Sequence, residues 1–97
     1  MTLIIVLDVK PENCEAPLEL IERNTREFIS QQPGFVSANL HRDAESTRLV
    51  NYAQWESGAL YAQARAQAEF IAFSAQVAAL TEHIEPIPCR PVFALRR

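Results

Sequence analysis

The segment FVSANLHRDAESTRLVNYAQW, from Phe35 to Trp55, decides the fold because two strand-like runs flank a short polar stretch. Phe35–Arg42 and Arg48–Trp55 each have the composition and spacing of a β-strand. Asp43–Thr47, which lies between them, is polar and typical of a turn. The segment therefore predicts an antiparallel hairpin in the middle of the chain.

Upstream of this hairpin, the sequence predicts a strand and then a helix. Leu3–Val9 is apolar at both odd and even positions, which is typical of a strand covered on both faces. Lys10–Ala16 is a polar connection, and Pro17 suits the first turn of a helix. Residues at helical spacing extend this helix to about Ser30, before the Pro-Gly break at 33–34.

Downstream of the hairpin, a helical stretch and a final extended segment follow. Ser57 is a suitable N-cap for an Ala- and Gln-rich helix from Ala59, which can divide near Ala66 and ends at residues 81–83. Three prolines restrict Ile84–Leu95 to an edge strand or an arm, with residues 92–95 best able to pair. The whole order is that of an α+β, ferredoxin-like split β-α-β fold, with an antiparallel sheet and helices on one face.

The hairpin register decides which side chains share a face of the sheet. If residue 42 pairs with residue 48, Asn39 stands opposite Asn51, and Phe35 opposite Trp55. One face is then aliphatic and suits the helices, whereas the other mixes aromatic, amide and imidazole groups. A one-residue slip would change all of these neighbours.

The mixed face predicts a homodimer. Leu49, Trp55 and Phe35 would form a large exposed apolar patch on a monomer. We expect a second copy to cover this patch with its own sheet, in a closed two-fold dimer. Two sheets packed in this way form an α/β barrel with cavities inside.

Composition narrows the class of protein. The 97 residues predict one domain, 1–97, and the net charge of −3 comes with scattered basic residues, which argues against nucleic acid as a partner. The first apolar run is too short to span a membrane and lacks the features of a signal peptide, so we expect a cytoplasmic protein with no membrane partner. Cys14 and Cys89 have no metal-binding spacing; free thiols are expected, although a disulfide is possible.

Four side chains suggest a binding pocket. Asn51 and Trp55 are four residues apart on one strand and share a face, and His41 is expected near that face on the neighbouring strand. Tyr61 follows just after the strand ends. An amide, an indole, an imidazole and a phenol around an apolar volume are suited to a planar aromatic molecule with a few polar substituents.

The stretches PGFVSANLHR (33–42) and RLVNYAQWES (48–57) resemble the antibiotic-biosynthesis monooxygenase family, most specifically at Asn51–Trp55. The resemblance implies a dimeric α/β barrel and oxidation of anthrone- or quinol-like aromatics by O₂ without metal, flavin or haem. It implies that residues like Asn51 and Trp55 line the site, with a Tyr like Tyr61 and a His like His41 near it. Further candidates for substrate contact are Phe35, Asn39 and Arg65, the last as a nearby candidate for an arginine of the family's site.

The implied mechanism is assisted by the substrate, whose phenolate or enolate reduces O₂ itself. Asn51 and Trp55 would donate hydrogen bonds to the substrate oxygen, and His41 or Tyr61 would accept or relay the proton. A non-catalytic dimer that binds a small aromatic ligand, and an isomerase or cyclase, stay open as alternatives. Haem degradation, known in related architectures, is disfavoured because the first strand lacks Asn and the helix 67–80 lacks His.

Overall fold

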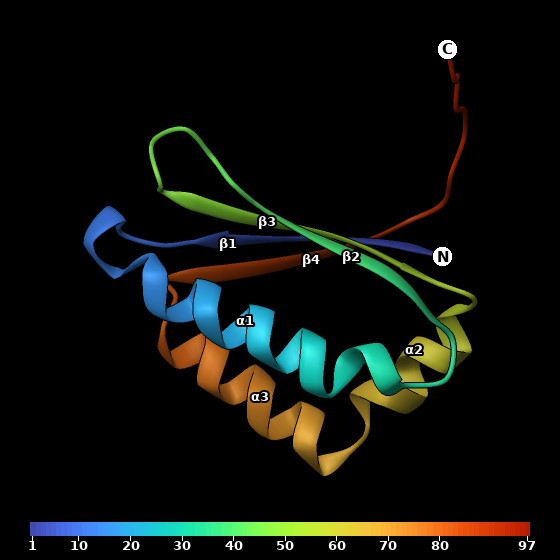
Figure 1. Cartoon of the computed structure of the whole chain (residues 1–97), viewed down its shortest axis with the longest axis horizontal. Helices are drawn as coiled ribbons and strands as arrows, with labels where there is room; N and C mark the ends of the chain where they lie inside the picture. The colour runs from blue at the N-terminus through green and yellow to red at the C-terminus, as the bar shows by residue number, and fades with distance from the viewer.

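The computed structural model describes residues 1–97 and contains a four-stranded sheet, three α-helices and two 3₁₀ turns (Figure 1). The elements are, in chain order, β1 (Thr2–Asp8), a 3₁₀ turn (Pro11–Asn13), α1 (Glu15–Glu27), a second 3₁₀ turn (Ile29–Gln31), β2 (Phe35–Arg42), β3 (Arg48–Trp55), α2 (Gly58–Arg65), α3 (Ala68–Ala79) and β4 (His83–Cys89).

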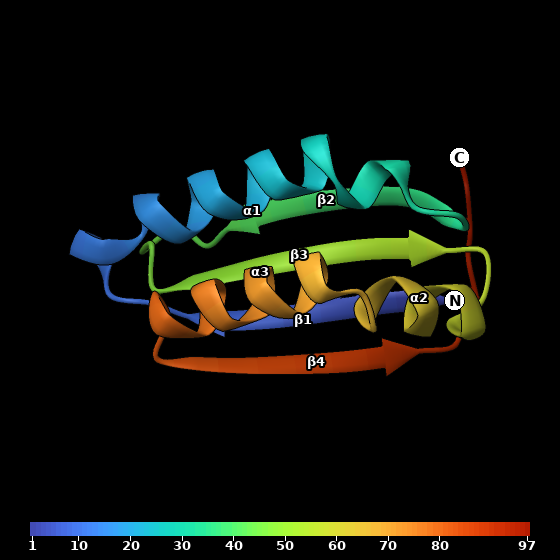
Figure 2. The ribbon, with the colours of Figure 1, turned by 90° about the horizontal axis from the view of Figure 1, so that it is seen from below.

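The sheet has the order β2-β3-β1-β4, and every neighbouring pair is antiparallel. All three helices cover the same face of this sheet, with α1 over β2 and α3 over the middle strands (Figure 2). This is the ferredoxin-like arrangement, so the predicted fold is confirmed. None of the helices combines the length and the apolar character needed to cross a membrane.

Local sequence signals predicted most ends of the strands and helices correctly. The two hairpin strands have their predicted bounds, and the helical stretch after them divides at residues 66–67. Ser57 is the N-cap of α2, because its Oγ accepts a hydrogen bond from the backbone N–H of Leu60 at 3.2 Å. The first helix begins at Glu15, two residues before Pro17, and ends at Glu27, where a 3₁₀ turn follows.

The last extended segment is an edge strand, as predicted, but its pairing residues differ from the prediction. Residues 83–89 pair with β1, whereas Val92–Leu95 pair with nothing and extend away from the sheet (Figure 1). The reason is the length of the partner strand. Cys89 pairs with Thr2 at the beginning of β1, so later residues have no strand beside them.

The predicted hairpin register is wrong by one residue. Arg42 pairs with Leu49, and Asn39 pairs with Tyr52 rather than with Asn51. A β-bulge between Phe35 and Ser37 absorbs the difference, so that Phe35 still pairs with Trp55.

The corrected register assigns the two faces of the sheet. The inner face, toward the helices, carries Leu3, Ile5, Leu7, Phe35, Ala38, Leu40, Leu49, Asn51, Ala53 and Trp55. The outer face carries Ile4, Val6, Asn39, His41, Val50, Tyr52 and Ile87. The expectation that Leu49, Phe35 and Trp55 would lie on the face turned away from the helices is therefore wrong.

The core consists of two apolar clusters along the inner face. One surrounds Leu7, Leu49 and Ile21, and the other surrounds Leu3 and Trp55. Ile5 packs against both clusters, and its partner across the β1–β3 pair is Asn51. A polar side chain therefore stands at the junction of the two halves of the core. Both cysteines are free thiols.

Candidate functional site

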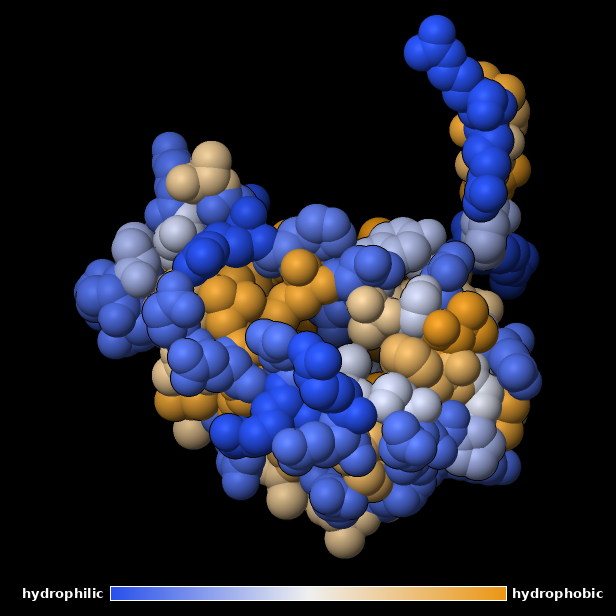
Figure 3. Space-filling view, viewed as in Figure 1, coloured by the Kyte–Doolittle hydropathy of each residue, from blue (hydrophilic) through white to orange (hydrophobic).

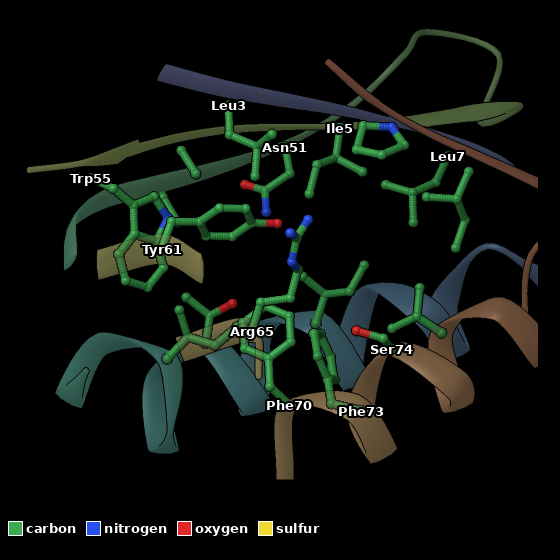
Figure 4. Close-up of a pocket in the computed structure, with 18 of the residues that line it drawn as sticks. Leu3, Ile5, Leu7, Asn51, Trp55, Tyr61, Arg65, Phe70, Phe73 and Ser74 are labelled. Carbon is green, nitrogen blue, oxygen red and sulfur yellow. The ribbon is translucent and has the colours of Figure 1, made fainter. Parts of the chain in front are cut away.

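A cavity of about 230 Å³ lies between the inner face of the sheet and the three helices (Figure 4). Its walls are mostly apolar, with contributions from all four strands and from each helix. Small-molecule sites are commonly concave, largely apolar and supplied with a few polar groups that fix orientation. The cavity has this character.

Five of the seven residues predicted for the site line this cavity: Phe35, Asn51, Trp55, Tyr61 and Arg65. The structure does not bring Asn39 and His41 to it. They pair with Tyr52 and Val50, so both lie on the outer face. The expectation that His41 would lie near the face of Asn51 is wrong, because the one-residue register shift reverses its side of the sheet.

Asn51 is the cavity residue with the sharpest polar signal. Its side-chain Oδ1 is buried and has no hydrogen-bond partner in the protein. Leaving a buried polar atom unpaired costs on the order of 1–3 kcal/mol. A carbonyl oxygen held in this way, on the wall of a cavity, is suited to a hydrogen bond with a bound molecule.

Four edge-to-face or tilted contacts form an aromatic wall along the cavity. Ring centroids are 5.6 Å apart for Phe35–Trp55, 5.4 Å for Trp55–Tyr61, 6.4 Å for Tyr61–Phe70 and 6.0 Å for Phe70–Phe73. These separations and angles are the ones that aromatic pairs prefer. Trp55, which is only 3% exposed, lines the cavity and is fixed between Phe35 and Tyr61.

Helix α2 supplies the other polar groups of the cavity. Tyr61 and Arg65 are one helical turn apart, and the Arg65 guanidinium carbon lies 5.2 Å from the Tyr61 ring centroid. The Tyr61 hydroxyl, the Asn51 amide and the Arg65 guanidinium point toward the same part of the cavity (Figure 4). The three ion pairs of the chain involve Arg26, Arg42 and Arg48, so Arg65 has no carboxylate partner.

Gly34 allows α2 to lie close to the start of β2. Its φ is +88°, a conformation that favours glycine, and a Cβ there would lie 2.6 Å from Cβ of Leu60. Leu60 precedes Tyr61 on the helix. The Pro-Gly break therefore does more than end a helix, since it also leaves room for the element that carries Tyr61 and Arg65.

Sequence reasoning missed two hydroxyl residues that line the cavity, Thr25 of α1 and Ser74 of α3. Ser74 follows Phe70 by four residues and precedes Val77 by three, so it belongs to the stripe that faces the sheet. The sequence signal that could have identified Ser74 was a single hydroxyl within an apolar helical stripe. Thr25 follows Ile21 by four residues on α1, so its hydroxyl also lies within an apolar helical stripe.

Comparison with known proteins gives concordant results. The sequence model of the antibiotic biosynthesis monooxygenase family matches residues 1–76. The chain is 37% identical over 73 residues to tetracenomycin-F1 monooxygenase of Streptomyces glaucescens. That match covers 71% of this chain and 65% of the relative, so the chain spans less than two thirds of that relative's length.

Two solved structures extend the likeness to three dimensions. A monooxygenase of Streptomyces coelicolor in complex with nanaomycin D has a TM-score of 0.89 at 26% identity, covering 99% of this chain and 90% of that one. SnoaB, a cofactor-independent oxygenase from Streptomyces nogalater, has a TM-score of 0.72 at 25% identity, covering 94% and 93%.

Proposed function

The chain belongs to the antibiotic biosynthesis monooxygenase family, and on that premise we propose that it oxidises an electron-rich, anthrone- or quinol-like aromatic with O₂. We propose further that the reaction uses no metal, flavin or haem. The support from relatives is a cofactor-independent oxygenase at 25% identity and a monooxygenase at 26% identity in complex with nanaomycin D.

The observation that carries the proposal is the unpartnered amide oxygen of Asn51 in an aromatic-walled cavity. An apolar ligand alone would leave this oxygen unsatisfied. A phenol or an enol offers an O–H to the amide oxygen and an oxygen to the amide N–H, while its ring lies against Trp55. The cavity therefore suits an oxygenated aromatic better than a hydrocarbon.

For an anthrone, the reaction balances without an external reductant. The central CH₂ loses a proton to give an enolate, which transfers electrons to O₂ and forms a C–O bond. The resulting hydroperoxide loses water and leaves a C=O group. One oxygen atom enters the quinone and the other leaves as water, and the substrate carbon supplies all four electrons.

The roles of the cavity residues follow from their chemistry. Asn51 and the Trp55 indole N–H donate hydrogen bonds to the substrate oxygen, and the guanidinium of Arg65 favours the anion that forms. Tyr61 relays the proton. The aromatic wall, with Phe35 at one end, orients the ring and excludes water.

The proposed assembly is a homodimer through the outer face. This face has no covering element, and its apolar residues include Tyr52 at 38% exposure and Ile87 at 39%. The C-terminal tail extends on the side away from the helices, with Val92, Phe93 and Leu95 between 83% and 96% exposed (Figures 1 and 3). A second copy seated on the outer face would cover both apolar surfaces.

The test is oxygen uptake by purified, metal-free protein with a panel of anthrones and quinols. The matched variant is Trp55→Phe, which keeps an aromatic ring but removes the indole N–H from the only tryptophan of the chain. We expect uptake above background that falls in this variant. A folded protein that binds these compounds without consuming O₂ would contradict the proposal and favour the ligand-binding or isomerase alternatives.

A further inference from the structure

The outer face of the sheet carries a row of side chains that crosses all four strands. Residues paired directly across neighbouring strands point to the same face. The pairings of β2 with β3, β3 with β1 and β1 with β4 give a row that reads, across the sheet, His41, Val50, Val6 and Glu85. An imidazole therefore stands at one edge of the outer face and a carboxylate at the other.

The middle of the outer face is apolar, and its charges lie at the rim. Tyr52 and Ile4 occupy the two middle strands in the next row, beside Val50 and Val6. His41 and Glu85 are both exposed, and neither takes part in an ion pair of the chain. They are three strand spacings, or about 14 Å, apart, which is too far for contact within one copy.

Two kinds of two-fold axis can seat a second copy on this face, and both lie in the plane of the interface. An axis that runs across the strands places β4 over the partner's β4, so the two Glu85 carboxylates share one edge. An axis that runs along the strands places β4 over the partner's β2, so Glu85 faces His41 at both edges. Like charges opposed across an interface are costly, and the second arrangement avoids them.

The spacing of packed sheets brings these two side chains within reach. Sheets that pack face to face are about 10 Å apart, and their strand directions differ by about 30°. Because β2 and β4 are each about 7 Å from an axis along the strands, this rotation shifts facing residues by only about 4 Å. A histidine and a glutamate that extend into the gap from opposite sides can then meet, with an imidazole N–H donating to the carboxylate.

The C-terminal tail favours the same arrangement independently. The tail follows β4 and leaves the sheet on the outer side, with Val92–Leu95 unpaired (Figure 1). With the axis along the strands, the tail lies beside the partner's β2, an edge strand without proline from Phe35 to Arg42. With the axis across the strands, it would lie beside the partner's β4, where Pro86 and Pro88 cannot donate to a ladder.

We infer that two copies of this chain associate about a two-fold axis parallel to the strands, with Glu85 of each protomer against His41 of its partner. This inference rests on the proposed homodimer, to which it adds the orientation and the pair of residues that select it. The outer face is complementary to itself in this orientation, so its partner is a second copy of the chain.

The first experiment exchanges the two charges and measures the dissociation constant of the dimer by sedimentation. His41→Glu opposes two carboxylates at both edges and should raise the dissociation constant at least about tenfold. Glu85→Lys should also raise it. The double variant faces unlike charges again, so we expect its dissociation constant to return to within about threefold of the wild-type value. Because the two positions cannot touch within one copy, this recovery would locate the contact between copies.

The double variant also distinguishes the two axes. With the axis across the strands it would oppose like charges at both edges and bind more weakly than either single variant, which would overturn the inference. An unchanged dissociation constant in His41→Glu would overturn it as well. Glu19→Lys makes the same charge change as Glu85→Lys at an exposed position on α1, in the helical layer, and should have no effect.

A second experiment tests the orientation by crosslinking. Cys89 belongs to the row of Ser37, across Gln54 and Thr2, so Ser37→Cys places a thiol opposite the partner's Cys89. A short bismaleimide should join the protomers of Ser37→Cys covalently. The wild-type dimer should not be joined, because its two Cys89 residues lie at opposite edges and Cys14 is buried. Crosslinking of the wild-type dimer, or of neither protein, would overturn the inference.

The failure of this inference can be told apart from that of the proposed function. A wild-type protein that stays monomeric at every concentration would contradict the homodimer and the orientation together. A dimer that does not respond to the charge exchange would remove the orientation alone. Oxygen uptake is measured separately, and its absence would remove the oxygenase proposal while leaving the interface.

Discussion

The inner and outer faces of the sheet come from the same four strands, yet residues of β3 that point to opposite faces have different surroundings. Leu49 is fully buried under the helices, while Tyr52 on the outer face is 38% exposed. Both faces are rich in apolar residues. The helices cover the apolar residues of the inner face. No element of the chain covers those of the outer face.

The same comparison applies to polar groups. Asn39 on the outer face is exposed and can bond to water, whereas the amide oxygen of Asn51 is buried without a protein partner. An exposed amide costs little free energy of folding, whereas a buried amide oxygen without a partner is destabilising. Its presence on the inner face is therefore better explained by binding than by folding.

The largest expected effect is on stability, and it compares neighbouring residues of β3. Leu49→Ala should lower the free energy of unfolding by about 2–5 kcal/mol, because it opens a cavity in the core. Arg48→Ala, whose side chain makes an exposed ion pair with Asp8, should cost less than about 1 kcal/mol. Urea denaturation of both variants measures the difference, and equal losses would contradict the assignment of the faces.

The next effect is on catalysis, and it compares two asparagines on neighbouring strands. Asn51→Ala should lower the rate of oxygen uptake by about 10²–10³-fold, as expected when a donor to a developing anion is removed. Asn39→Ala makes the same chemical change on the outer face and should leave the rate unchanged. His41→Ala should behave like Asn39→Ala. A loss of activity in Asn39→Ala or His41→Ala would contradict this assignment and indicate that the reaction takes place on the outer face.

The sequence predicted the bounds of the strands and helices better than it predicted which face of the sheet each side chain occupies. Strand bounds at Phe35–Arg42 and Arg48–Trp55, and the N-cap at Ser57, follow from local composition and were correct. The register depends on how residues 43–47 close the hairpin and on a bulge beside Val36, neither of which has a distinct signal in one sequence. Because a single-residue shift reverses every side chain, this small error misplaced Asn39 and His41.

The candidate site was predictable where it did not depend on register. Asn51 and Trp55 share a face because they are four residues apart on one strand, whichever side that face takes. Tyr61 and Arg65 are one turn apart on a helix, so their association is local as well. The cavity lies inside one copy rather than between two sheets. Predicting this location requires the correct hairpin register, so it was missed.

A third comparison tests what covers the outer face. Tyr52→Glu should raise the dissociation constant of the proposed dimer by at least about tenfold, since it introduces a charge into an apolar contact. Ile71→Glu is the control, because Ile71 is 58% exposed on α3, in the helical layer away from the outer face. Sedimentation at several protein concentrations measures both. A wild-type protein that stays monomeric would contradict the homodimer.

The smallest effect concerns the hairpin loop, whose geometry decides which residues become inner and outer. The Asp43 carboxylate accepts hydrogen bonds from the backbone N–H of Arg48 at 2.9 Å, and from the N–H and Oγ1 of Thr47 at 2.8 and 2.9 Å. These bonds, that from Arg48 first, lower the pKa of Asp43 from its ordinary value. Because the folded-state pKa is the lower one, the carboxylate stabilises the fold above the unfolded pKa of about 3.9.

That contribution is lost as the pH falls through the lowered pKa of the folded state. Asp43→Asn should therefore be slightly less stable than the wild-type protein at pH 7, and the difference should shrink below about pH 4. Urea midpoints at both pH values measure this, with Glu45→Gln in the same loop as a control for the loss of one charge. If the difference between Asp43→Asn and the wild-type protein were the same at both pH values, the ionised carboxylate would not be what holds the loop, and the register would depend on the strands alone.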